Sequence, residues 1–163
     1  MSAVVIETVR AIVAAVPDPE LPVLTIDDLG VLRAVRVDED GHVEVDITPT
    51  YSGCPAMDVI RADVEDRLAQ AGMTNSVVRL VLAPAWSTDE ITETGRRKLL
   101  DYGIAPPTGR AAVAGPVALP LTVRCTQCGS ADTRELSRFG STACKALWAC
   151  NACREPFDSF KTL

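Results

Sequence analysis

The chain has 163 residues and carries 16 Lys and Arg against 22 Asp and Glu, a formal net charge of −6, so its length excludes a large multidomain enzyme. Apolar residues make up 47% of it and aromatic residues only 4%, which excludes disorder throughout and predicts a core of Val, Leu, Ile and Ala. No apolar run approaches the roughly 18 residues that cross a bilayer, and no basic segment precedes an apolar stretch at the amino terminus. We therefore expect a cytoplasmic protein without a membrane span or a secretory signal.

The first part of the chain begins with a predicted helix and two predicted strands. Apolar residues recur at helical spacing over residues 5–16, and Pro17 must end that helix. Residues 31–37 and 42–48 then read as two strands around the turn 38–41. They predict a β-hairpin.

Three further elements are predicted between residues 55 and 103. Pro55 and Gly72 frame a second helix, because proline favours the first helical position and glycine the position after the last. Residues 76–82 are rich in Val and Leu and predict a third strand. Ser87 and Glu90 form a capping box for a helix that reaches about Leu100. The order of elements predicts an α+β fold with a small sheet covered by helices on one face.

The carboxyl-terminal part differs in composition. Five of the six cysteines follow residue 124, and residues 121–163 hold 6 basic and 4 acidic side chains, whereas residues 1–120 hold 10 and 18. Proline and glycine punctuate residues 105–120. We therefore predict an α+β domain at 1–104, a Pro/Gly-rich linker at 105–120 and a small second domain at 121–163.

Two Cys-x-x-Cys pairs dominate the second domain, Cys125 with Cys128 and Cys150 with Cys153, separated by 21 residues. Four thiolates are the ligand set of a closed tetrahedral zinc site, and a segment this small needs a metal or disulfides to fold. We predict a structural zinc ribbon. The same ligands would suit an iron–sulfur cluster, and redox-active thiols are a third interpretation.

Two other residues have metal-binding side chains but a plainer interpretation. Cys144 lies between the two pairs and is surplus to a four-ligand site, so it is either a packed small apolar residue or an alternate ligand. His42, the only histidine, lies beside the predicted hairpin turn and is expected to be an exposed strand residue.

Cys54 is the one cysteine of the first domain, and it directly precedes the second predicted helix. The positive end of a helix dipole lowers the pKa of a thiol and favours the metal-binding thiolate, although a buried cap cysteine is the alternative. One thiolate cannot fill a metal's coordination, so Asp18, Glu20 or a partner's ligands would complete the site. Asp18 and Glu20 could equally be solvated or cap the next turn.

Several segments together resemble a known family. Residues 18–22 (Asp-Pro-Glu-Leu-Pro), 28–30 (Asp-Leu-Gly) and 50–55 (Thr-Tyr-Ser-Gly-Cys-Pro) resemble the metal–sulfur cluster assembly domain of SufT-like proteins. With residues 139–147 (Phe-Gly-Ser-Thr-Ala-Cys-Lys-Ala-Leu) and 155–161 (Glu-Pro-Phe-Asp-Ser-Phe-Lys) added, nearly the whole chain resembles the PaaD (PaaJ) family associated with bacterial phenylacetyl-CoA epoxidase.

The resemblance implies an accessory role in aerobic phenylacetate catabolism. It implies assistance in assembling a metal or iron–sulfur centre of the oxygenase or reductase, with a transient iron or cluster site at Cys54. The implied partners are those oxygenase and reductase subunits and iron–sulfur assembly proteins. A non-catalytic structural subunit of the oxygenase complex is the alternative.

The residues exclude the catalytic roles in such a system. A di-iron subunit needs several Glu residues and Glu-x-x-His pairs on bundle helices, and this chain has one histidine. A reductase needs a dinucleotide fingerprint, and no Gly-x-Gly-x-x-Gly occurs. Six scattered basic side chains in residues 121–163 form no stripe for nucleic acid. We therefore expect a protein that is not an enzyme.

Overall fold

The structure is a computed structural model that describes residues 3–108 and 122–162. It is an α+β fold, as predicted, and it divides into two compact units, Met1–Thr92 and Glu93–Leu163. Each unit contains one sheet. No helix among the described residues is long and apolar enough to span a bilayer.

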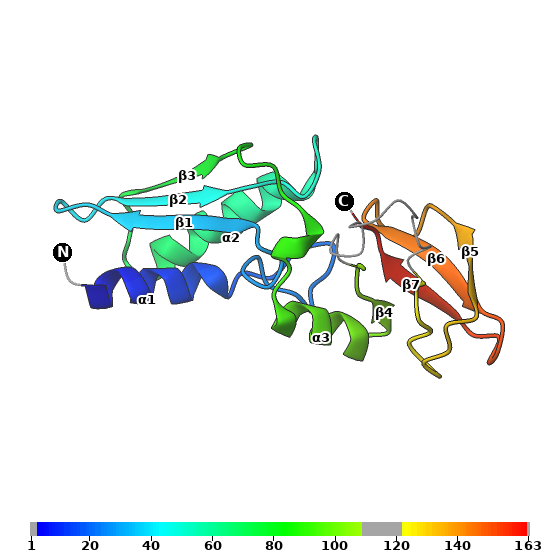
Figure 1. Cartoon of the computed structure of the whole chain (residues 1–163). Helices are drawn as coiled ribbons and strands as arrows, with labels where there is room; N and C mark the ends of the chain where they lie inside the picture. Colours follow the sequence, from blue (N-terminus) through cyan, green and yellow to red (C-terminus); the bar gives the residue numbers. More distant parts are fainter. Residues whose placement is uncertain (1–2, 109–121, 163) are drawn as a thin grey trace. The chain divides into compact units, whose positions relative to one another are not determined.

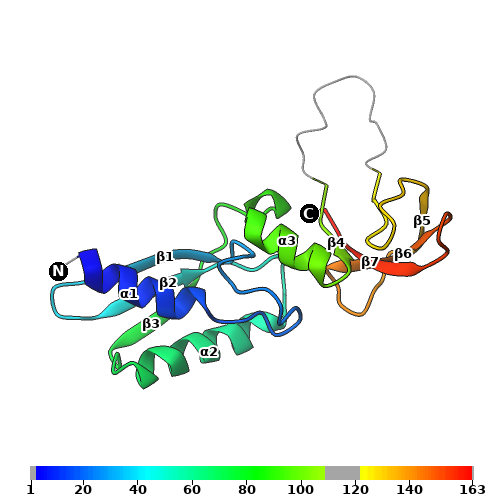
Figure 2. The same cartoon turned by 90° about the horizontal axis from the view of Figure 1, so that it is seen from below.

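The first unit is a three-stranded sheet with two helices on one face (Figures 1 and 2). β1 (Leu32–Val37) and β2 (Val43–Ile47) form the predicted antiparallel hairpin, and β3 (Ser76–Leu80) lies parallel to β2 on its other side. Parallel neighbours need a crossover connection, which α2 (Ala56–Gln70) supplies. α1 (Ala3–Ala14) lies against the same face as α2.

The core of this unit lies between the two helices and the sheet. The predicted apolar stripes face it, so that Val9, Val13 and Val16 from the first and Val64 and Leu68 from the second are completely buried. The other completely buried side chains are Leu24, Ile26, Val45 and Ile47. With few aromatic residues, the core is built from aliphatic side chains, as the composition predicted.

The predicted capping box at Ser87 and Glu90 is wrong. The Ser87 hydroxyl accepts a hydrogen bond from the Asp89 N–H at 3.1 Å, but it starts only the 3₁₀ turn η1 (Thr88–Glu90). The Glu90 carboxylate forms an ion pair with Arg33 at 2.6 Å, and the chain is extended at Ile91. α3 therefore begins later, at Glu93–Asp101, and Gly103 follows it with φ of 84°.

Gly30 fits closely against η1, which gives a testable prediction. Its φ is +71°, and a Cβ added there would lie 2.8 Å from both the Cβ and the carbonyl oxygen of Glu90. Gly30→Ala should therefore lower the free energy of unfolding by about 2 to 4 kcal/mol, because left-handed strain and overpacking add. Chemical denaturation measures this.

Gly41 provides the matched control for that substitution. Its φ is +80°, but among the described residues nothing beyond its own chain neighbours lies within 4 Å of an added Cβ. Gly41→Ala should therefore cost only the strain, about 1 kcal/mol. Equal losses for the two alanine variants would contradict the close approach at Gly30.

The second unit contains a four-stranded sheet in the order β4-β7-β6-β5. β5 (Thr133–Ser137), β6 (Lys145–Cys150) and β7 (Pro156–Phe160) are antiparallel neighbours, and the short β4 (Ile104–Ala105) pairs in parallel with β7. Sequence patterns had not identified these four strands individually. α3 and β4 are therefore part of this unit, although the sequence grouped them with the first domain.

The predicted domain boundary after residue 104 can be tested with two fragments. We expect residues 1–92 to unfold cooperatively on their own. Residues 1–104 should be no more stable than that, within about 0.5 kcal/mol, because Ile104 has lost its strand partner Asp158. Thermal and denaturant unfolding of both fragments measures this. A much more stable 1–104 fragment would place the boundary where the sequence did. The predicted linker lies largely outside the described residues.

Candidate functional site

Four cysteine sulfurs come together in the second unit. The Sγ atoms of Cys125, Cys128, Cys150 and Cys153 all lie within 4.8 Å of one another. Cys125 and Cys128 lie in a turn before β5, Cys150 ends β6, and Cys153 lies in the turn that leads to β7. The pairs predicted from the sequence are therefore adjacent in space, and they form the one such group among the described residues.

The distances suit a tetrahedral ion. Cys125 Sγ lies 3.7 Å from Cys153 Sγ, and Cys128 Sγ lies 3.6 Å from Cys150 Sγ. A tetrahedron with zinc–sulfur bonds of about 2.3 Å has edges of about 3.8 Å. These four cysteines would hold such an ion and leave no open position for a substrate.

Backbone N–H groups and the neighbouring sulfurs set the pKa values of these thiols. The Cys153 N–H donates to Cys150 Sγ at 3.4 Å, and together with the Ala152 N–H and neighbouring thiols it lowers the pKa of Cys150 to about 7. The Glu155 N–H acts to lower the pKa of Cys153, but burial and the three other sulfurs outweigh it and raise that pKa to about 12. Four thiolates so close together need a cation, which is the chemistry of a metal site.

Little apolar packing supports the unit around these sulfurs. Cys125 and Cys150 are buried against Ala105 and Phe157, and Val123 and Trp148 pack on that cluster. A core this small gives little stability, so a bound metal would be the main stabilising element.

Cys144 does not join the four sulfurs. It is buried, and its Sγ lies 3.0 Å from the Thr142 hydroxyl. The plainer interpretation, a packed small residue, accounts for this position. A role for Cys144 as an alternate ligand stays a prediction.

The three candidate residues of the first unit lie close to one another. The charges of Glu20 and Asp18 both act on the Cys54 thiol, which is partly buried in the turn before α2. Asp18 is buried, and its Oδ1 accepts the N–H groups of Glu20 at 2.9 Å and Leu21 at 2.7 Å. Asp18 therefore caps the loop 18–22, as one of the sequence interpretations expected.

The expected low pKa of Cys54 is wrong. Burial raises the pKa of this thiol, and the nearby carboxylates of Glu20 and Asp18 raise it further. The Ala56 N–H at the helix start and the Tyr51 side chain act in the lowering direction, but they do not outweigh burial. The free thiol is therefore protonated near neutral pH, and a cation beside the two carboxylates would favour its ionisation.

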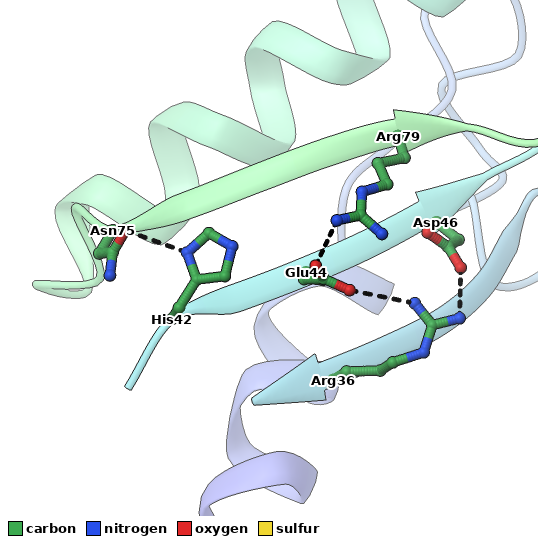
Figure 3. A network of polar contacts seen from close by, with 6 residues as sticks. All are labelled: Arg36, His42, Glu44, Asp46, Asn75 and Arg79. Carbon is green, nitrogen blue, oxygen red and sulfur yellow. Dashed lines mark hydrogen bonds and ion pairs between the residues drawn. The ribbon is translucent and has the colours of Figure 1, made fainter. Parts of the chain in front are cut away.

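Other polar groups lie on the open face of the first sheet, where no sequence motif indicated them. Figure 3 shows that Arg36 contacts Glu44 and Asp46, and that Arg79 also contacts Glu44. The Arg36–Asp46 distance is 2.5 Å. The charges alternate across neighbouring strands, so they stabilise strand pairing rather than form a binding site.

His42 lies at the edge of the same face. It is exposed, as predicted, and its Nδ1 lies 3.0 Å from the Asn75 side-chain oxygen (Figure 3). It is not among the residues that could hold a metal in the described part of the chain.

Comparison with known proteins matches both halves of the chain. Residues 6–79 match the family described as iron–sulfur cluster assembly protein, and residues 111–161 match the PaaD zinc beta ribbon domain. The chain is 46% identical over 158 residues to an Escherichia coli protein named as a putative 1,2-phenylacetyl-CoA epoxidase component, covering 97% of this chain and 93% of that protein. The chain belongs to the PaaD family. The resemblance found in the sequence is confirmed.

Other relatives cover only the amino-terminal part of this PaaD-family chain. The Fe-S protein maturation auxiliary factor SufT of Staphylococcus aureus is 37% identical over 73 residues, which are 44% of this chain and 82% of that protein. A solved domain of unknown function, DUF59, from Bacillus anthracis aligns with a TM-score of 0.54 and 30% identity over 58% of this chain and 90% of that one. These relatives support an accessory, non-catalytic role.

Proposed function

We propose that this chain assists the assembly of a metal or iron–sulfur centre in the oxygenase or the reductase of a phenylacetyl-CoA epoxidase system. The epoxidase link rests on the name of the Escherichia coli relative, and the assembly role rests on the maturation factors related to the first unit. The observation that carries the proposal is the proximity of Cys54, Glu20 and Asp18 in that unit.

Iron or an iron–sulfur cluster would be the cargo of this site. Glu20 and Asp18 attract a cation electrostatically, and the Cys54 thiol gives up its proton to solvent as the cation approaches. The resulting thiolate and the carboxylate oxygens provide a mixed, incomplete ligand set. An incomplete set suits transfer, because a receiving protein can add its own ligands before the donor's ligands leave.

The ribbon would have a different task in this proposal. We assign zinc to Cys125, Cys128, Cys150 and Cys153, and four thiolates saturate that ion. The zinc would stabilise the second unit and take no part in transfer. The ribbon would then be available to bind the partner oxygenase or reductase.

One observation favours the alternative of a purely structural subunit. Asp18 already caps the loop 18–22, and burial keeps Cys54 protonated. Both residues could therefore serve the local fold alone.

The test is to produce the oxygenase and reductase with this chain and without it, and to measure the iron and acid-labile sulfide in each purified protein. A maturation factor should raise the metal content of at least one of them. A structural subunit should change the complex that is recovered and leave the metal content per subunit unchanged.

A further inference from the structure

The second unit contains a cavity that is separate from the four cysteines. Its volume is about 500 Å³, and side chains of β5, β6, β7 and the turn after β5 line it. Phe139, Trp148 and Phe160 contribute to the lining, so three of the seven aromatic residues in the chain meet at this cavity. In a chain so poor in aromatic residues, this concentration sets the cavity apart from the rest of the surface.

The rim of the cavity holds an exposed aromatic ring in place. The Phe139 side chain is 81% exposed, the highest value among the exposed large apolar residues that the structure describes. Lys161 Nζ lies 5.4 Å from the centroid of that ring and donates a hydrogen bond to the Ala143 carbonyl at 2.9 Å. A cation–π contact therefore positions a large apolar group in solvent, where it contributes little to the fold.

The charges around the cavity favour an acidic partner. Arg138 and Lys161 line it against one carboxylate, Glu135, which lies 3.7 Å from Arg138. Residues 93–163 as a whole hold ten Lys and Arg against six Asp and Glu. Two cations and one anion are too few for the phosphate backbone of a nucleic acid, which needs a row of basic side chains.

We propose that this cavity is the docking site for an acidic segment of a partner protein that also carries an apolar anchor side chain. The anchor packs on Trp148 and Phe139, and the carboxylates of the segment meet Arg138 and Lys161. Buried aromatic and arginine side chains carry most of the affinity in protein interfaces, so these residues are the expected hot spots. The inference rests on the proposed function, in which the partner is the oxygenase or the reductase of the epoxidase system.

The test measures binding of the full-length chain to the purified oxygenase and to the purified reductase by isothermal titration calorimetry. Phe139→Ala and Arg138→Glu should each raise the dissociation constant about tenfold or more, as hot-spot substitutions do. Leu136→Ala and Arg134→Glu are the controls, because both residues are exposed on β5 and neither lines the cavity. The controls should stay within about twofold of the unmodified chain.

Four outcomes would overturn the docking site. They are cavity variants that bind as the controls do, an unmodified chain that binds neither protein, a labelled single-stranded oligonucleotide bound in their place, and self-association that the cavity substitutions abolish. Unchanged metal content in all variants shows that they are folded. If the cavity variants bind normally and Cys54→Ser still lowers the iron content of the client, only the docking inference fails. The reverse pattern overturns the assembly role and leaves the docking site.

Discussion

Removing the metal from the ribbon should unfold the second unit and leave Met1–Thr92 folded. The apolar cluster around Cys125 and Cys150 is small, whereas binding of structural zinc contributes about 10 to 16 kcal/mol in small zinc modules. Cys150→Ser should have the same effect, because it removes a buried ligand from the group of four. Amide NMR spectra with and without a chelator measure this, together with a zinc content of about one per chain before treatment.

Cys144→Ser is the matched control for that substitution. Cys144 is also a buried cysteine of the second unit, but its sulfur contacts the Thr142 hydroxyl rather than the other thiols. We expect Cys144→Ser to keep its zinc and its fold. A second unit that stays folded after complete metal removal would contradict the zinc ribbon, and loss of zinc from Cys144→Ser would make Cys144 a ligand.

Cys54→Ser should leave the chain folded and impair the maturation of its client. Serine preserves the volume of cysteine and is itself a favoured residue at a helix start, so a purely structural Cys54 would tolerate it. A hydroxyl is a far less acidic and harder ligand than a thiol, and we expect the cargo metal to bind about tenfold more weakly, or weaker still. Oxygenase or reductase produced with this variant should contain less iron and turn over phenylacetyl-CoA slowly.

The control for Cys54→Ser is the Cys144→Ser variant, which should support full iron content in the client. Both variants should unfold at the same temperature as the unmodified chain to within a few degrees, equivalent to about 1 kcal/mol. Full iron content and full activity with Cys54→Ser would favour the structural subunit.

Much of the first unit could be predicted because its signals are local. The apolar stripe that ends at Pro17, the alternation in β1 and β2, and the Pro55 and Gly72 boundaries each act within one element. The prediction failed at Ser87, where the same capping residue starts a 3₁₀ turn. The decisive partner there is Arg33, which holds Glu90 from a strand more than fifty residues earlier, and no local pattern reveals such a pair.

The candidate site shows the same division. The spacing of the two cysteine pairs was enough to predict that four sulfurs would meet, because two such turns present their thiols to one ion. The pKa of Cys54 was predicted in the wrong direction, since helix position is visible in the sequence but burial is not. The approach of Glu20 and Asp18 from another loop adds negative charge that the sequence could not place. The cavity beside Phe139 and Trp148 was likewise invisible before the strands were paired.

The central claim is that Cys54 binds the cargo metal, and the most direct measurement is metal analysis of the anaerobically purified chain. The unmodified chain and Cys54→Ser are each incubated with ferrous iron, freed of unbound metal and analysed for iron and zinc. The account predicts about one zinc in both proteins and retained iron in the unmodified chain only. Equal iron in the two proteins, or none in either, would contradict it.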